Sequence, residues 1–139
     1  MSNDVQITDN ADEFRNEMER KTEKALEQMG QYAEDEAKLN LERPPRRVDT
    51  GRLRNSITHA TPGNSGFTNS YSDDDGNEYT DQIGQVSQDD KSAYIGTNVE
   101  YAEEIHEGRP GLDPNRFLRN AVEQNQDTYR KMIDEIMRE

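Results

Sequence analysis

The stretch that decides the fold is Asp49-Thr50-Gly51-Arg52-Leu53-Arg54-Asn55-Ser56-Ile57. Asp49 or Thr50 is suited to cap a short helical turn over residues 51–55, because both side chains accept hydrogen bonds from unpaired backbone N–H groups. Residues 56–61 carry several β-branched side chains and predict a strand, which the proline and glycine at 62–63 end. The stretch therefore predicts a turn of helix that leads directly into a sheet.

A long helix is expected before this stretch. Asn10, with Glu13 three residues later, has the pattern of a capping box, and apolar or small residues then recur at steps of three and four as far as Leu41. The two prolines at 44–45 stop the helix, which is then roughly 30 residues or about 45 Å long. Residues 1–9 are expected to form a flexible arm. The apolar stripe is thin, so it can serve either a plain core or contact with a neighbouring subunit, and both interpretations stay open.

The segment that follows the predicted strand is acidic. Residues 63–90 contain seven Asp or Glu and no Lys or Arg. Two short segments, 67–71 and 79–86, flank the turn sequence Asp75-Gly76-Asn77 and predict a hairpin, with a mobile loop as the alternative. The segment is therefore expected to be an acidic loop or hairpin insertion.

The last third of the chain predicts one strand and two helices. Residues 92–97 form the clearest strand, and a short helix over 99–106 follows it, ended by Gly108. Asp113 caps a last helix that has Pro114 at its first position and an apolar stripe to nearly the end of the chain.

The order of these elements predicts a single α+β domain over residues 1–139. It consists of a long N-terminal helix, a small antiparallel sheet of three or four strands, and a short helix and a C-terminal helix packed on one face.

Hydrophobic content is low. Leu, Ile, Val and Phe make up 21 of the 139 residues and the net charge is −13, so the core is small and gains from burial against neighbouring subunits. The acidic surface argues against sequence-specific nucleic acid binding and against anionic membranes, because both need clustered Lys and Arg. It indicates adaptation to very high salt, an acidic lumen that repels passing DNA, or both.

No catalytic or metal-binding pattern stands out. The chain has no cysteine, and its two histidines, His59 and His106, lack HExxH-type spacing. A calcium loop fails in register, because with Gly76 at its sixth position the first and twelfth positions are Tyr71 and Gln82. The chain is therefore expected not to be an enzyme and to hold no metal or cofactor.

Two later stretches join the first in a recognisable order. Gly96-Thr97, Tyr101-Ala102 and Glu107-Gly108 end the predicted strand and form the next helix, and Arg109-Pro110 leads to Phe117-Leu118. In this order the stretches resemble the tail-completion, or head–tail joining, proteins of siphovirus-type phages and related archaeal viruses. The chain departs from that pattern by residues 111–116, which intervene before Phe117, and by its long acidic segment.

The resemblance implies a structural protein of the virion. Such a subunit forms a ring, of six copies in the family, at the neck or the top of the tail, where it terminates the tail tube and joins the tail to the head. Its implied partners are further copies of itself, the tail tube protein and the neck or connector proteins, and DNA passes through the ring. The implied location is the virion, after assembly in the host cytoplasm, and salt adaptation would indicate a haloarchaeal virus.

Two candidate surfaces follow. The hypothetical subunit interface is arginine-rich, because guanidinium groups pair well with carboxylates of an adjacent subunit; it comprises Arg46, Arg47, Arg52 and Arg54. The hypothetical lumen or ring contact is acidic and comprises Asp73, Asp74, Asp75, Glu78 and Asp81.

The sequence leaves two alternative functions open. A head-side stopper or adaptor ring of the same neck differs from the first interpretation only by its position in the particle. An acidic monomeric inhibitor or DNA mimic belongs to a different class and would bind a basic protein.

Overall fold

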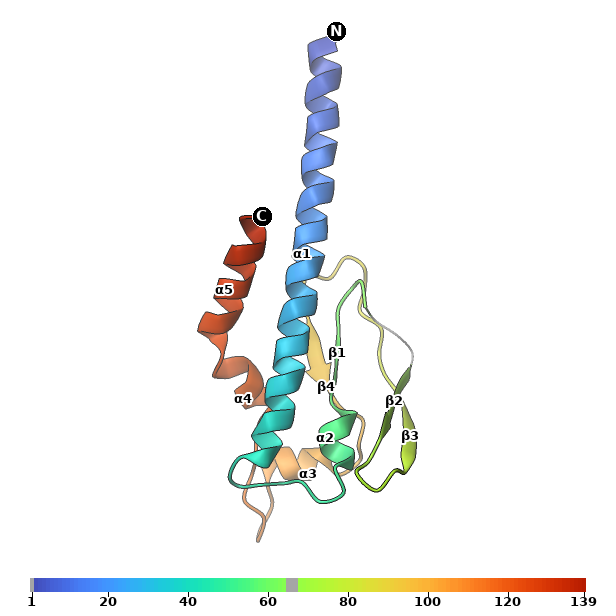
Figure 1. Ribbon diagram of the computed structural model, residues 1–139, viewed down its shortest axis with the longest axis vertical. Helices are drawn as coiled ribbons and strands as arrows, with labels where there is room; N and C mark the ends of the chain where they lie inside the picture. Colours follow the sequence, from blue (N-terminus) through green and yellow to red (C-terminus); the bar gives the residue numbers. More distant parts are fainter. Residues whose placement is uncertain (1, 65–67) are drawn as a thin grey trace.

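The computed structural model describes the backbone of residues 2–64 and 68–139, and side chains from Ala11 onward within those ranges. The elements in chain order are α1 (Ser2–Glu42), α2 (Arg52–Ser56), β1 (Thr58–Ala60), β2 (Thr68–Ser72), β3 (Glu78–Gln82), β4 (Tyr94–Gly96), α3 (Ala102–Glu107), α4 (Phe117–Glu123) and α5 (Gln126–Met137). α1 runs the height of the molecule, with α4 and α5 along one flank and the strands on the other (Figure 1). The predicted α+β class is confirmed.

The N-terminal helix is longer than predicted. α1 spans 41 residues, about 60 Å at 1.5 Å per residue, and ends at Glu42 just before the prolines. It begins at Ser2, so the predicted start at Asn10 is wrong. Residues 2–9 contain no proline or glycine, and the capping preference of Asn10 therefore does not interrupt the helix. The flexibility of residues 1–9 stays a prediction.

The apolar core lies at the base of the molecule, beside the C-terminal end of α1. Phe117 of α4 is fully buried there, against Ala37 and Leu41 of α1. Small residues at this contact let α1 and α4 approach closely. The other buried members are Leu53 of α2, Ile57 directly after it, Val99 before α3, Ala102 at the start of α3 and Ala121 of α4.

A polar seam fastens the middle of α1 to β1 and the turn after it. The carboxylate of Glu34 accepts a hydrogen bond from His59 Nδ1 at 2.9 Å, and Glu27 accepts one from His59 Nε2 at 2.6 Å. One turn earlier, Glu23 accepts a hydrogen bond from the Thr61 hydroxyl at 2.6 Å. The seam supplies contacts that a chain with so little apolar side-chain area cannot obtain from its core alone.

The predicted sheet of three or four strands is divided in two. β1 pairs antiparallel with β4, with His59 opposite Ile95, and β2 pairs antiparallel with β3. Side-chain amides attach β2 to helix α2, which precedes β1: Asn69 Nδ2 donates to Ser56 O at 3.0 Å, and Asn55 Nδ2 donates to Ser72 O at 2.8 Å. The expectation of one sheet is therefore corrected to two two-stranded sheets.

The acidic segment contains the predicted hairpin. β2 and β3 pair over five residues each, and Gly76 in the turn between them has a φ of +87°, which favours glycine. The hairpin interpretation is confirmed for residues 68–82, and Phe67 lies outside the described residues.

The last helix starts later than predicted and is broken. Asp113 and Pro114 do not begin it, because the backbone N–H of Asn115 donates to Ile105 O and the buried Asn115 side chain donates to Asn40 O. α4 begins only at Phe117. A second helix, α5, begins at Gln126, after Asn125, whose side chain binds the carbonyl of Ala121 at 3.0 Å.

The short helix α3, which precedes α4, lies close to its predicted position. α3 begins at Ala102, three residues after the predicted first residue, because Val99 N donates to the Thr97 hydroxyl in a preceding turn. Gly108 follows α3 with a φ of 78°, in agreement with its predicted role as the terminating glycine.

Candidate functional site

The four arginines of the hypothetical interface all line one open hollow of about 620 Å³. The loop after α1 contributes Arg46 and Arg47, and the first turns of α2 contribute Arg52 and Arg54. Asp49 is the one carboxylate among the lining residues. In a chain with a net charge of −13, this arginine hollow gathers four of the 17 basic residues at one place.

Arg54 joins three segments of the chain. Its Nη1 lies 2.7 Å from Glu42 Oε1 at the end of α1, and its Nη2 lies 2.6 Å from Asp74 Oδ1 in the hairpin turn. The hydrogen bond from Arg54 is the main reason that the pKa of Glu42 is lowered. Arg54 therefore holds the hairpin against the end of α1, and both terminal nitrogens of its guanidinium already contact carboxylates of the same chain.

Arg52 is held by an aromatic ring and a carboxylate. Its guanidinium lies 4.4 Å from the centre of the Tyr79 ring, and its Nη1 lies 3.1 Å from Glu100 Oε1. Its Nε is buried and has no hydrogen-bond partner among the described residues. Arg52 thus retains one unused donor beside the hollow.

Arg46 and Arg47 are bound mainly by backbone carbonyls. Arg46 Nη1 donates to Val48 O at 2.8 Å, and its Nε lies 3.2 Å from Glu42. Arg47 Nη2 donates to Asp113 O at 2.8 Å, and its Nε has no partner within the described part of the chain. No salt bridge to Arg47 is found there, so its charge stays available to a carboxylate from outside.

The predicted acidic surface is not one continuous patch. Asp73 is buried in the hairpin turn, where it accepts hydrogen bonds from the N–H groups of Asp75 and Asn77 at 3.0 and 2.9 Å. Burial works to raise the pKa of Asp73, but hydrogen bonds from Asn77, Tyr79 and Asp75 together outweigh it and leave that pKa lowered. Asp81 accepts a hydrogen bond from the Tyr71 hydroxyl at 2.7 Å. With Asp74 bound to Arg54, the two acids left exposed without a side-chain partner in the described chain are Asp75 and Glu78.

The structure shows why a glycine is needed at position 51, a reason that the sequence did not reveal. Asp74 N donates to Thr50 O at 2.7 Å, and a Cβ added to Gly51 would lie 2.6 Å from the Asp74 carboxyl carbon. Gly51 also has a φ of +83°. The glycine is therefore needed both for its backbone conformation and for the close approach of the hairpin. The acidic turn can be recognised in the sequence, but no pattern near Gly51 shows that this turn packs against it.

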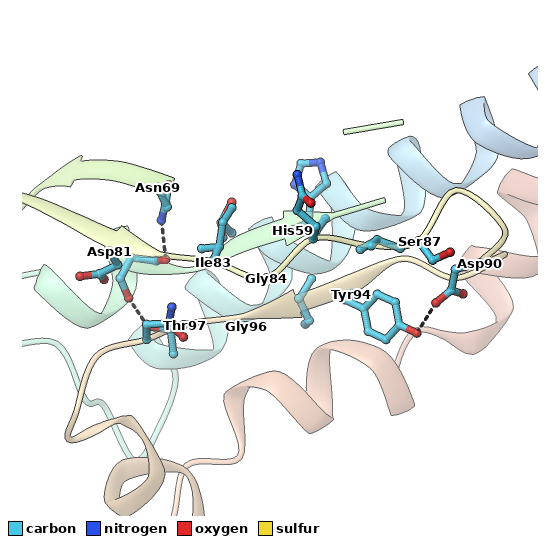
Figure 2. Close-up of a pocket in the computed structure, with 17 residues that line it drawn as sticks. His59, Asn69, Asp81, Ile83, Gly84, Ser87, Asp90, Tyr94, Gly96 and Thr97 are labelled. Atoms are coloured by element: carbon cyan, nitrogen blue, oxygen red, sulfur yellow. Dashed lines mark hydrogen bonds between the residues drawn. The ribbon is translucent and has the colours of Figure 1, made fainter. Parts of the chain in front are cut away.

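A second hollow, of about 380 Å³, lies between the β1/β4 sheet and the segment 83–90 (Figure 2). At one end Tyr94 donates to Asp90 at 2.8 Å, and at the other the Ser56 and Thr97 hydroxyls lie 2.5 Å apart. His59 borders the hollow, but both of its ring nitrogens face the α1 carboxylates. Neither hydroxyl has a base beside it among the described residues, so no activated nucleophile is assembled there.

Within residues 11–64 and 68–139, no three His, Cys, Asp or Glu side chains are grouped so that they could hold a metal ion. No helix in the described chain combines the length and the apolar character needed to cross a bilayer.

The described residues thus form an α+β fold with open surface hollows and no assembled catalytic group. A family model described as "Bacteriophage HK97-gp10, putative tail-component" matches residues 6–108. The chain therefore belongs to the HK97-gp10-like family of phage tail components, which is structural and generally non-enzymatic. No curated protein and no solved structure matches the chain.

Proposed function

We propose that this tail component forms a ring at the top of the tail, where it terminates the tail tube and joins the tail to the head. The family match over residues 6–108 supports a place in the tail. The observation that carries the ring is the arginine hollow, which has four arginines and one lining carboxylate in a strongly acidic chain. A neighbouring copy offers abundant carboxylates to such a surface.

The charge that acts between subunits comes mainly from Arg46 and Arg47. Arg52 and Arg54 already have carboxylates of their own chain within 3.1 Å. Arg47 forms no salt bridge within the described chain, and the exposed Arg46 shares its one carboxylate, Glu42 at 3.2 Å, with Arg54. The original set of four thus divides into two arginines that hold the hairpin and two that face a neighbour.

The acidic hairpin is proposed to face the lumen or the next ring through Asp75 and Glu78. Both side chains are exposed at the turn and at the start of β3. Negative charge at a channel wall repels the DNA backbone and lets it pass without binding. The proposed partners are other copies of the chain in a ring of six, the tail tube protein and the neck proteins. The complex is proposed to assemble in the host cytoplasm and to remain in the virion.

The test measures assembly of purified chain with and without tail tubes, by native mass spectrometry and negative-stain electron microscopy. The double variant Arg46→Ala with Arg47→Ala should fold normally and lose the ring. A matched control, Lys131→Ala with Arg138→Ala, removes the same charge from exposed positions at the other end of the molecule and should retain it. Rings that form equally well in both variants would refute the role of the arginine hollow.

A further inference from the structure

The first part of α1 projects beyond the rest of the molecule. α5 covers the helix only as far as Lys21 and Lys24, where Lys24 Nζ lies 2.7 Å from the Glu139 carboxylate and Lys21 donates to the Glu139 backbone. Every residue from 11 to 20 is exposed, and Figure 1 shows the N-terminal part of α1 extending beyond the other elements. This segment, the projecting helix, has no cover from the described chain.

The projecting helix carries two large apolar side chains on one face. Phe14 is 66% exposed and Met18 is 37% exposed. They lie four residues apart, and steps of three and four continue from Met18 through Lys21 to the buried Ala25. The face that packs against the body of the molecule therefore continues as an uncovered apolar face beyond it.

An apolar groove of about 530 Å³ lies on the body, between α1, β4 and the helices α4 and α5. Its exposed apolar members are Tyr94, Val122 and Ile133. Its lining also includes Arg119 and Arg130 and contains no carboxylate. In a chain with 30 acids and 17 basic residues, a lining of this kind suits an apolar segment with acidic flanks.

The projecting helix has that composition. Besides Phe14 and Met18, residues 11–20 contain four acids and two arginines, and the acids are Asp12, Glu13, Glu17 and Glu19. The helix cannot reach the groove of its own chain, because Phe14 lies about 22 Å along a continuous helix from Met29, the first groove residue on α1. Its fit is therefore to another molecule.

We propose that the projecting helix of one copy docks its Phe14–Met18 face in the α1/β4/α5 groove of a second copy. The helix and the groove are different surfaces, so each copy inserts its helix into one neighbour and receives the helix of another. Such head-to-tail contacts close into a ring when the rotation between neighbouring copies allows it. The inference rests on the proposed ring and identifies the contact that would build it, in addition to the arginine hollow.

Site-directed cross-linking tests this contact, since the wild-type chain has no cysteine. Phe14→Cys chain is mixed with tagged Val122→Cys chain and treated with a short bis-maleimide, and the products are separated by mass. The matched control replaces the first partner with Leu39→Cys, an exposed α1 residue outside the groove with 51% exposure. The mixed 14–122 dimer should exceed the 39–122 dimer several-fold and should disappear when Arg119→Glu and Arg130→Glu are added to the Val122→Cys chain.

Three cross-linking results would overturn the inference, and one assembly result would do so as well. One is equal cross-linking of the 14–122 and 39–122 pairs, and another is no mixed dimer at millimolar chain concentration. A third is equal cross-linking of Phe14→Cys chain with itself, since the projecting helices would then pair with each other. Ring assembly separates this contact from the proposed function. If the double variant Phe14→Ser with Met18→Ser still forms the wild-type ring, the proposed contact is wrong and the proposed ring is supported. If no ring forms on tail tubes but the 14–122 dimer still forms, the proposed ring is wrong and the proposed contact is supported.

Discussion

Protonation of His59 should set the pH dependence of stability on the alkaline side. The side chain is 7% exposed and lies between Glu34 at 2.9 Å and Glu27 at 2.6 Å. The hydrogen bond to Glu34, together with that to Glu27, raises the pKa of His59 to about 9 against the opposing effect of burial. The folded state therefore binds this proton more tightly than the unfolded state, in which the pKa is near 6.5.

The magnitude follows from the shift. A change from 6.5 to about 9 corresponds to about 3 kcal/mol at 1.36 kcal/mol per unit, and solvent screening at the partly exposed Glu27 lowers this to about 2–3 kcal/mol. The sign is that of a raised pKa, so the contribution is fully present below pH 6.5 and is lost as the pH rises through about 9. Glu34 acts in a separate window, because His59 and Lys38 outweigh its burial and lower its pKa, so its contribution is lost in acid.

The assay is urea unfolding of wild type and His59→Gln at several pH values between 6 and 10. The difference in unfolding free energy between the two should fall by about 2–3 kcal/mol from pH 6 to pH 10. Other groups that titrate in this range cancel in the difference, and His106→Gln controls for loss of an imidazole outside the seam. A difference that stays constant from pH 6 to pH 10 would refute the reasoning.

Four further predictions concern stability. Gly51→Ala should cost about 2–3 kcal/mol and Gly76→Ala about 1 kcal/mol, because both have a positive φ but only the first meets the Asp74 carboxylate; equal losses in chemical denaturation would contradict this. Phe117→Ala should cost about 3–5 kcal/mol by the same measurement, since the side chain is fully buried, and a loss below about 1 kcal/mol would contradict the core assignment. A double-mutant cycle of Arg54→Ala and Asp74→Ala should give a coupling of about 0.5–1 kcal/mol that decreases with salt; no coupling would mean that Arg54 does not hold the hairpin. If the acidity is a salt adaptation, the melting temperature should rise steeply from low to molar salt, and full stability at low salt would exclude it.

Strong local signals predicted much of the fold. The proline pair at 44–45 follows the end of α1 at Glu42, and the Asp75-Gly76-Asn77 turn lies between β2 and β3. Such signals work because they depend on backbone conformations that neighbouring residues determine.

The errors in the last helix arose where side-chain hydrogen bonds take over backbone partners. Asn115 binds the end of α1 and so delays the last helix to Phe117. Asn125 and Tyr129 both donate to the carbonyl of Ala121, and the chain bends there so that the Tyr129 ring meets Tyr32. Helix periodicity and capping preferences contain no information on these contacts.

Only part of the candidate site could be predicted from the sequence. Clustering of Arg46, Arg47, Arg52 and Arg54 around one hollow follows from their closeness in sequence. The pairing of Arg54 with Asp74 joins residues 20 positions apart and depends on how the hairpin docks. Composition identified the charges but could not say which of them neutralise each other within one chain.

The central claim is that this chain closes the top of the tail and joins it to the head. Electron microscopy of particles from a virus in which the chain has been inactivated tests it most directly. The account predicts heads separated from tails, with tail tubes of uncontrolled length, because nothing stops tube growth. Detached tails of normal length would indicate a head-side ring instead, and complete particles with normal tails would contradict the account.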